Sequence, residues 1–334
     1  RTLFMLVNSV VIALGFVGLI WGADKFVYGA SALARSAGVS PLLIGLTIVA
    51  FGTSAPEIFS SAVSALENKP ELAIGNAFGS NLFNIGVALG VAAILRPLTP
   101  PKSLVKKEIP ALLLVTFVTG ALLFDLFVGF FDAMVLIALT AFLGYKILSN
   151  KASRLELIAE AGDAGEAGQA NDEAIPAPDE TEPVKAWQAI AYLVLGLILL
   201  IVSAEALVAA ASAIAETLGV SEAVIGLTIV ALGTSLPELA ASITCVLKGH
   251  YDLAIGNIVG SNILNLLAVL PFPGLLSPGL IQAPLLFRDY AAVTLLTLVL
   301  SAFCYYAVTR GKQLGRLSGV LFLSVYCGWF AIML

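Results

Sequence analysis

Two glutamates, Glu57 and Glu238, stand deep inside apolar stretches of this 334-residue sequence. Each ends a copy of the same motif, which reads GTSAPE in the first case and GTSLPE in the second. The threonine of each motif lies four residues before the glutamate, so both side chains share one helical face. The proline before each glutamate donates no backbone hydrogen bond and disturbs the preceding turn. Carboxylate, hydroxyl and freed carbonyl oxygens at one place favour the coordination of a cation.

A second polar motif, GNxxGSNxxN, follows each glutamate. Ser80 and Asn84 are four residues apart in the first copy, as are Ser261 and Asn265 in the second. We expect Asn81 and Asn262, one position off that face, to hold helices together. The glycines of the motif are expected to let helix backbones approach closely: Gly75, Gly79, Gly256 and Gly260.

All of these candidate ligands are oxygen atoms. Such a set suits hard cations such as Ca²⁺, Na⁺ or Mg²⁺, and does not suit Zn²⁺ or copper. His250 is the only histidine, which excludes a histidine-based metal site.

Both motifs belong to a long internal repeat. Residues 45–84 and 226–265 align without a gap at an offset of 181, and 22 of the 40 positions are identical. The register extends further, since Pro97 and Pro278 are also 181 residues apart. We therefore infer that a whole unit was duplicated.

The composition predicts an all-α, polytopic membrane protein. Charged residues make up 12% of the chain, hydrophobic residues 59%, and the mean hydropathy is +1.00. The apolar stretches are continuous, as in membrane helices, and do not alternate as in barrel strands. The three cysteines lie in apolar stretches and indicate no disulfide framework. We expect no cleavable signal peptide, the first span serving as the insertion signal.

We expect ten transmembrane helices, five in each half. The predicted spans are 3–33, 41–66, 71–95, 106–124, 130–148, 187–215, 222–247, 252–275, 289–308 and 317–334. The sequence thus divides into a first five-helix repeat (1–150), an acidic linker (151–185) and a second five-helix repeat (186–334). The linker holds nine acids and no Lys or Arg between residues 155 and 184, which predicts a solvated segment.

The positive-inside rule sets the orientation. With the N-terminus outside, the inside loops hold 13 Lys and Arg, and the outside loops hold three: Arg1, Lys69 and Arg288. We expect both termini outside and the linker in the cytoplasm. Because five is an odd number, the second repeat enters the membrane inverted, a plan common among alternating-access transporters.

Charge alone suggests what these acids do. Two nearby carboxylates inside a membrane must be neutralised by cations, protonated or hydrated. Two negative charges match one divalent or two monovalent cations, so these ions compete, as in an antiporter. A second acid pair at equivalent positions, Asp24 and Glu205, has a structural or gating role or is a further ligand; Lys25 lies beside Asp24.

The doubled GTSxPE and GNxxGSNxxN motifs resemble the repeats of the calcium:cation antiporter superfamily, and most of all its prokaryotic sodium/calcium exchanger branch. The resemblance covers both halves and implies exchange of Ca²⁺ for Na⁺ through four clustered cation sites. It implies that Ca²⁺ is bound by Glu57 and Glu238 and by backbone oxygens of Thr53 and Thr234. The implied sodium sites add Ser54, Ser235, Ser80, Ser261 and the carbonyls of Ala50 and Ala231. Asn84 and Asn265 would fill the middle position between the glutamates, where some relatives have one aspartate.

Other functions remain open at this stage. The main alternative is a proton-coupled or K⁺-dependent antiporter of Ca²⁺ or another divalent cation, because neighbouring carboxylates favour each other's protonation. A sodium-coupled symporter or a channel fits less well, since the repeat offers no aromatic or Arg residue for an organic solute and its breaks occur once per half. The lack of a Ser–His or His–Glu arrangement argues against an enzyme.

The remaining expectations follow from this function. We expect Ca²⁺ and Na⁺ as substrates, no cofactor and no nucleic-acid partner. The protein should be a monomer in the lipid bilayer of the inner (cytoplasmic) membrane.

Overall fold

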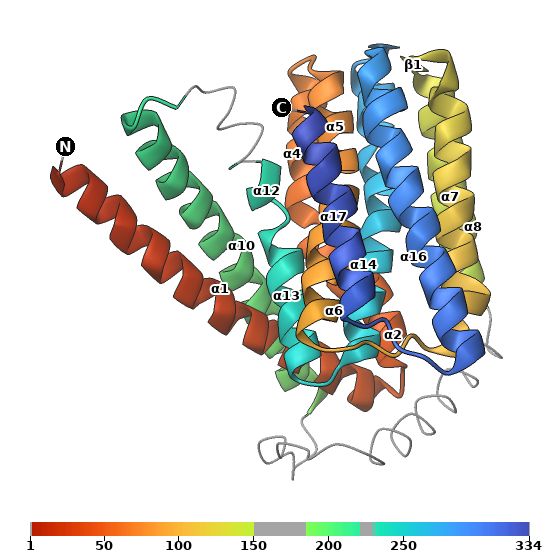
Figure 1. Cartoon of the computed structure of the whole chain (residues 1–334), viewed down its shortest axis with the longest axis horizontal. Coiled ribbons are helices and arrows are strands. Elements are labelled where there is room, and N and C mark those ends of the chain that lie inside the picture. Colours follow the sequence, from red (N-terminus) through yellow and green to blue (C-terminus); the bar gives the residue numbers. More distant parts are fainter. Residues whose placement is uncertain (1, 150–184, 221–228, 230, 334) are drawn as a thin grey trace.

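Helices make up nearly all of the computed structural model, which describes residues 2–149, 185–220, 229 and 231–333 (Figure 1). Eight helices of the described residues are long and apolar enough to cross a membrane: Leu3–Ala37, Pro70–Leu95, Leu104–Asp125, Phe130–Ile147, Ala186–Thr217, Tyr251–Leu276, Leu285–Arg310 and Arg316–Met333. A ninth span is broken, since Pro41–Thr53 and Ala55–Leu66 meet at a bend of 45°. The prediction of an all-α, multi-pass membrane protein is confirmed.

The count of ten spans stays a prediction. Most of the first half of the expected span 222–247 lies outside the described residues, and its second half is the helix Leu236–Leu247. The predicted linker also lies almost entirely outside the described residues, so the three-part division of the chain remains a prediction as well.

The elements of the first half are mostly helices, several of them short segments with π-helical hydrogen bonding, together with one short strand. In order they are α1 (Thr2–Ala37), α2 (Pro41–Ile44), η1 (Gly45–Val49), α3 (Ala50–Thr53), α4 (Ala55–Leu66), α5 (Pro70–Phe83), η2 (Asn84–Leu89), α6 (Gly90–Leu95), η3 (Leu104–Glu108), α7 (Ile109–Leu122), η4 (Leu123–Asp125), β1 (Phe127–Val128) and α8 (Phe130–Ser149).

The second half follows the same plan. Its described elements are α10 (Ala186–Thr217), α12 (Ala231–Gly233), α13 (Leu236–Leu247), α14 (Tyr251–Leu264), η6 (Asn265–Val269), α15 (Pro271–Leu276), β2 (Gly279–Leu280), η7 (Leu285–Tyr290), α16 (Ala291–Arg310) and α17 (Arg316–Met333). The short strands β1 and β2 pair antiparallel and join the two halves at the upper end in Figure 1.

The repeat in the sequence is also a repeat of backbone geometry. The π-helical segments η2 and η6 begin at Asn84 and Asn265, which are 181 residues apart, and η3 and η7 begin at Leu104 and Leu285 with the same offset. Such π-helical turns are uncommon and occur often at functional sites. Their recurrence at one offset indicates that both halves fold by the same local rules.

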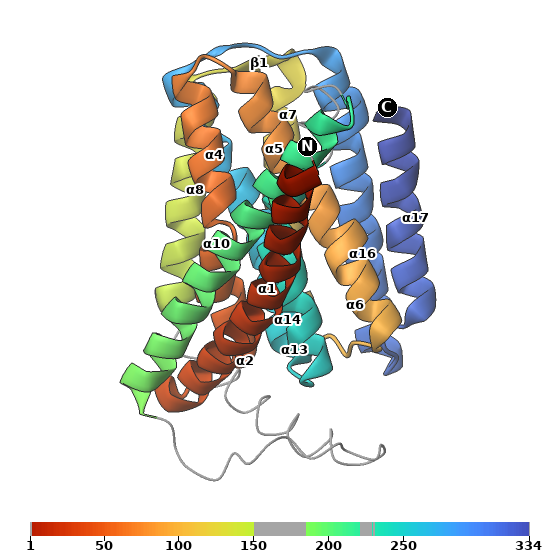
Figure 2. The ribbon, with the colours of Figure 1, turned by 90° about the vertical axis from the view of Figure 1, so that its left-hand side faces the viewer.

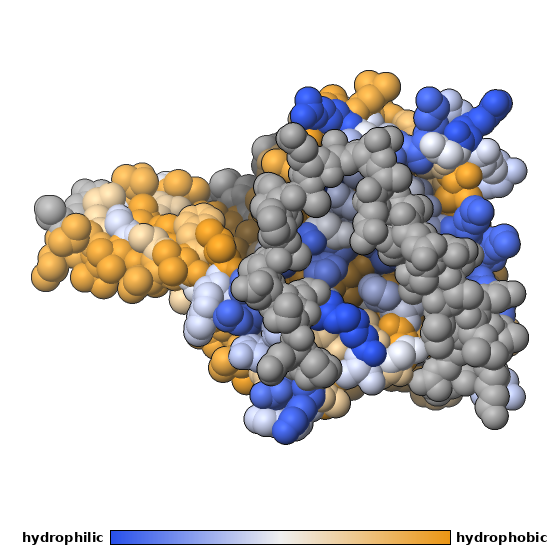
Figure 3. Space-filling model, turned by 90° about the horizontal axis from the view of Figure 1, so that it is seen from below, coloured by the Kyte–Doolittle hydropathy of each residue, from blue (hydrophilic) through white to orange (hydrophobic). Residues whose placement is uncertain are grey.

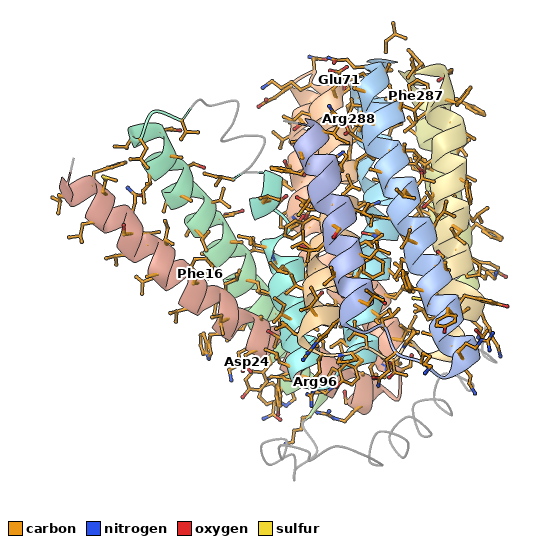
Figure 4. All side chains as sticks on the ribbon, viewed as in Figure 1. Phe16, Asp24, Glu71, Arg96, Phe287 and Arg288 are labelled. Carbon is orange, nitrogen blue, oxygen red and sulfur yellow. The ribbon has the colours of Figure 1, made fainter. Side chains whose placement is uncertain are left out.

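Equivalent parts of the two repeats lie at opposite ends of the bundle. Glu71, in the first turn of α5, lies at the upper end, whereas Asp24 lies near the lower end (Figure 4). Lys248, just after α13, pairs with Asp24, so the α13–α14 turn is also at the lower end. An inverted repeat requires this arrangement of the α4–α5 and α13–α14 units.

The centre of the bundle is formed by the spans 70–95 and 251–276, which are 72% and 83% buried over their most apolar windows. The corresponding value for α1 and for the span in α8 is 11%. The exposed residues of these outer helices are large and apolar, as a lipid-facing surface requires. Seen from below, α1 and α10 form an apolar arm, while hydrophilic residues gather on the lower face of the bundle (Figure 3).

Helices α1 and α10 run side by side along one side of the bundle, and their upper ends diverge from it (Figures 1 and 2). Their backbones nearly touch. A Cβ atom on Gly29 would lie 2.3 Å from the backbone nitrogen of Leu193, and one on Gly196 would lie 2.3 Å from that of Phe26. Contacts this close hold the two helices together as one unit.

Candidate functional site

The two glutamates sit at matching breaks in the helices. Helix α3 ends at Thr53, Ser54 leaves the helical conformation with φ −84° and ψ 2°, and α4 begins at Ala55. Ser235 repeats this geometry with φ −94° and ψ 7° before α13. A proline in the first turn of the new helix removes no hydrogen bond from that helix. The break places each glutamate in the first turn of a 12-residue helix, where the helix dipole favours negative charge.

Hydrogen bonds cross between the repeats and bring the glutamates together. Ser54 Oγ donates to Glu238 Oε1 at 3.1 Å, and Ser235 Oγ donates to Glu57 Oε1 at 3.1 Å. Each serine therefore reaches the glutamate of the other repeat. Ser235 Oγ also lies 3.1 Å from Ser80 Oγ, which joins α5 to the same cluster. All five of these residues are buried: Ser54, Glu57, Ser235, Glu238 and Ser80.

Four asparagines from α5, α14 and the π-helical turns after them form a second layer of crossed contacts. Asn84 Nδ2 donates to Asn262 Oδ1 at 3.2 Å, and Asn265 Nδ2 donates to Asn81 Oδ1 at 3.1 Å. Asn81 Nδ2 donates to the backbone oxygen of Asn262 at 3.2 Å. Asn81 and Asn262 thus join the two repeats, as the sequence predicted.

Five buried oxygens in this region have no hydrogen-bond partner among the described residues: Glu57 Oε2, Glu238 Oε2, Asn84 Oδ1, Asn265 Oδ1 and Ser261 Oγ. We call the side chains of the two glutamates, Ser54, Ser235, Ser80, Ser261, Asn84 and Asn265 the cage. A buried polar atom without a partner is destabilising, and several of them in one place indicate a missing ligand. All five are acceptors that suit a hard cation, whereas the unpartnered Asn262 Nδ2 beside them is a donor and is not counted in the cage.

Protein cations do not neutralise the cage within the described part of the chain. The ion pairs found there join Asp24 to Lys25 and Lys248, and Arg288 to Asp289, with one more in the α4–α5 turn. None of them involves Glu57 or Glu238. Two carboxylates enclosed without a basic partner are expected to attract cations from solution.

The motif threonines lie at the margin of the cage. Thr53 is buried, and its hydroxyl, which donates to Asn257 Oδ1, also lies 3.1 Å from the backbone oxygen of Val49, so it is the carbonyl of Thr53 that stays a candidate ligand. Thr234 is partly buried at the equivalent position. Ala50 begins α3 and is buried, whereas Ala231 begins α12 with a side chain outside the described ones.

Sequence reasoning missed one pair of site residues, Asn76 and Asn257. Asn257 Oδ1 accepts a hydrogen bond from Thr53 Oγ1 at 3.1 Å, and its Nδ2 lies 3.4 Å from Ser242 Oγ. Asn76 Nδ2 donates to the backbone oxygen of Glu57 at 3.2 Å. The signal was present, because residues 76, 80 and 84 repeat at a spacing of four and all recur at the offset of 181.

The glycines predicted to allow close packing do so in the second copy. A Cβ on Gly256 would lie 2.5 Å from the backbone oxygen of Leu42, and one on Gly260 would lie 2.4 Å from that of Leu46. For Gly75 and Gly79, no backbone atom of the described residues lies this close.

The second acid pair is not part of the cage. Asp24 forms ion pairs with Lys248 at 2.5 Å and Lys25 at 3.4 Å. Glu205 is exposed on α10. The contacts of Asp24 favour the structural or gating role over the role of an ion ligand.

Comparison with known proteins identifies the family. The model of the family described as sodium/calcium exchanger protein matches residues 7–149 and 188–334. The chain belongs to the sodium/calcium exchanger family. Each matched segment contains one glutamate of the cage, Glu57 in the first and Glu238 in the second, so the family match includes both copies of the motif.

The alignments with relatives extend over nearly the whole chain. The chain is 40% identical to the putative antiporter CaxA of Alkalimonas amylolytica, over 97% of this chain and 98% of the relative. It is 35% identical to the inner membrane protein YrbG of Escherichia coli (98% and 97%). It is 30% identical to the sodium/calcium exchanger MaX1 of Methanosarcina acetivorans (98% of both).

The fold of the exchanger also matches a solved structure. The sodium-calcium exchanger NCX_Mj, soaked with neither Na⁺ nor Ca²⁺, superimposes with a TM-score of 0.79 at 31% identity over 99% of this chain and 100% of that one. The protein is therefore a multi-pass membrane transporter of the antiporter type.

Proposed function

We propose that this exchanger moves Ca²⁺ across the membrane in exchange for Na⁺ by alternating access. One observation carries the proposal: two buried carboxylates, one from each repeat, share a cage of unpaired oxygens with no basic side chain beside them in the described part of the chain. The names of MaX1 and NCX_Mj, sodium/calcium exchangers, support the choice of ions.

In the proposed cycle, Ca²⁺ and Na⁺ use the same two glutamates, so that only one kind of ion is carried in each direction. Ligands come from both repeats: Glu57, Glu238, Ser54, Ser235, Ser80, Ser261, Asn84, Asn265 and backbone oxygens of Thr53, Thr234, Ala50 and Ala231. The joined pair α1 and α10 slides along the bundle and exposes the cage first to one side and then to the other.

The lower end of α1 has a contact that this motion must break. Lys248, in the α13–α14 turn, forms an ion pair with Asp24 on α1, while the upper ends of both helices diverge from the bundle (Figures 1 and 4). Opening towards the lower side requires that the pair separate. With the orientation set by the positive charges, that side is the cytoplasm, and both termini lie outside. We propose that the monomer is the working unit in the inner membrane.

The test uses purified protein in sealed liposomes. Vesicles loaded with Na⁺ and diluted into Na⁺-free buffer with ⁴⁵Ca²⁺ should accumulate Ca²⁺, and vesicles with a pH gradient alone should not. The variant Glu67→Gln is the matched control, since it removes an exposed carboxylate outside the cage. Uptake driven by the pH gradient alone would show that the coupling ion is H⁺ and not Na⁺. Uptake that needs K⁺ together with Na⁺ would indicate a K⁺-dependent exchanger.

A further inference from the structure

Each GNxxGSNxxN motif begins with an asparagine that lies beside the cage and is not part of it. Asn76 and Asn257 stand four residues before Ser80 and Ser261, so each lies on the same helix face as the cage serine, one turn away. Asn257 is completely buried. Its contacts decide whether such an amide binds the ion itself or holds the groups that do.

Both asparagines contact the helix that carries the glutamate of their own repeat. Asn76 Nδ2 donates to Ser61 Oγ at 3.0 Å and to the backbone oxygen of Glu57 at 3.2 Å. Asn257 Nδ2 donates to Ser242 Oγ at 3.4 Å, which is the equivalent contact at the offset of 181. Because a backbone oxygen only accepts, it fixes which end of the Asn76 amide faces α4. The matching contact gives Asn257 the same orientation, with Nδ2 towards α13.

The other end of the Asn257 amide reaches across to the first repeat. Asn257 Oδ1 accepts a hydrogen bond from Thr53 Oγ1 at 3.1 Å, and no second donor to this oxygen is found in the described part of the chain. Thr53 is the last residue of α3, directly before the helix break, and its carbonyl is a candidate ion ligand. The bond therefore holds a ligand-bearing residue at the point where the helical backbone is interrupted.

Asn257 thus joins two parts of the site that lie far apart in the sequence. Ser242 lies one helical turn after Glu238 on α13, whereas Thr53 lies just before the break that precedes Glu57. The Asn257 amide is hydrogen-bonded to the protein at both ends. In this it differs from the cage asparagines, whose Oδ1 atoms have no partner among the described residues. Its contacts are those of a group that holds ligands in place.

We propose that Asn257 is a positioning residue for ion binding, which sets the distance between the helix of Glu238 and the carbonyl of Thr53. Asn76 contributes within the first repeat by holding the first turn of α4, which carries Glu57. The inference rests on the proposed function for the identity of the ion, and on these contacts for the positioning. Removal of a group that orients metal ligands typically lowers metal affinity about 10- to 100-fold.

The test uses the Ca²⁺ concentration that half-saturates Na⁺-driven uptake, together with the thermal unfolding midpoint of the purified protein with and without Ca²⁺. Thr53→Val removes the hydroxyl, keeps the carbonyl and leaves Asn257 Oδ1 without its donor. We expect the half-saturating Ca²⁺ concentration to rise about 10- to 100-fold, with the maximal rate retained. Asn257→Ala should raise this concentration at least as much.

Thr116→Val is the matched control. Thr116 is also buried, and its hydroxyl donates to the backbone oxygen of Leu112 at 2.8 Å within α7, which contributes no residue to the cage. This variant also loses a buried hydroxyl, so its unfolding midpoint without Ca²⁺ should fall about as far as that of Thr53→Val. Its half-saturating Ca²⁺ concentration should equal that of the wild type. If Thr53→Val behaves in the same way as this control, the contact is structural only and the proposal is wrong.

A double variant shows whether Asn257 acts through Thr53. One shared contact predicts that Thr53→Val combined with Asn257→Ala binds Ca²⁺ no more weakly than Asn257→Ala alone. Effects that multiply would mean that the two residues act independently, which contradicts the positioning role.

Failure of the proposed function gives a different result. Uptake driven by H⁺ in place of Na⁺ corrects the coupling ion, and a weaker half-saturation by Ca²⁺ in Thr53→Val still supports the positioning role. If no cation raises the unfolding midpoint of the wild type or drives uptake, the cage binds no ion and both proposals are wrong.

Discussion

Replacing Glu57 by glutamine removes one charge from the cage and little else. Glutamine has nearly the same shape, and its side-chain oxygen accepts the hydrogen bond that Ser235 Oγ now donates at 3.1 Å. The variant should therefore fold. By the crossed bond from Ser54, the same argument holds for Glu238→Gln.

The size of the effect follows from the lost attraction between Ca²⁺ and one carboxylate. Near 4 Å and at an effective dielectric constant of 20, a pair of unit charges interacts by about 4 kcal/mol, so Ca²⁺ loses about 8 kcal/mol with one carboxylate. The repulsion between the glutamates acts with and without bound Ca²⁺, so its removal stabilises the protein but does not offset this loss. A loss of about 8 kcal/mol lowers Ca²⁺ affinity by about five to six orders of magnitude.

Two assays check this result. Na⁺-driven ⁴⁵Ca²⁺ uptake should vanish in Glu57→Gln and in Glu238→Gln at Ca²⁺ concentrations that saturate the wild type. The thermal unfolding midpoint without Ca²⁺ should be equal to or above that of the wild type, and Ca²⁺ should no longer raise it. The control Glu67→Gln should retain uptake and the Ca²⁺-induced stabilisation. Uptake within tenfold of the wild type in either cage variant would refute the reasoning.

Three further changes test other parts of the structure. Gly29→Ala places a methyl group against the backbone of Leu193, so thermal unfolding should show a loss of about 1–3 kcal/mol; an unchanged midpoint contradicts the close α1–α10 contact. Lys248→Gln leaves Asp24 without its shorter ion pair. Since both side chains are about a third exposed, the free energy of unfolding should fall by under about 1 kcal/mol, while the rate of Ca²⁺ uptake changes. The double variant Asp24→Lys with Lys248→Asp should restore the rate. Asn257→Ala removes two buried hydrogen bonds, so the free energy of unfolding should fall by about 2–4 kcal/mol, and Ca²⁺ should bind more weakly. An unchanged free energy of unfolding would contradict a structural role for Asn257.

The sequence located both helix breaks of the candidate site because the repeat marks them twice. Pro56 and Pro237 located both helix breaks, and the four-residue spacings placed hydroxyls and amides on shared faces. The constant offset of 181 also extends to backbone detail that was not predicted, such as the π-helical turns at Asn84 and Asn265. Local patterns of this kind survive in the sequence because each depends on residues three or four positions apart.

Contacts between distant segments could not be predicted in the same way. The bond from Ser54 to Glu238 joins residues 184 positions apart, and no local pattern sets the register of that approach. The pairing of Asp24 with Lys248 was missed for the same reason, since the sequence placed only Lys25 beside the acid. Asn257 was overlooked because its role, to accept from Thr53, depends on how α14 crosses α3.

The most direct test is anomalous diffraction from crystals soaked in Sr²⁺, a heavier stand-in for Ca²⁺. We expect one strong peak inside the cage, within about 2.3–2.6 Å of oxygens from both Glu57 and Glu238, that weakens as Na⁺ is added. An empty cage at saturating Sr²⁺, or a peak bound by one glutamate alone, would contradict a single site built by both repeats.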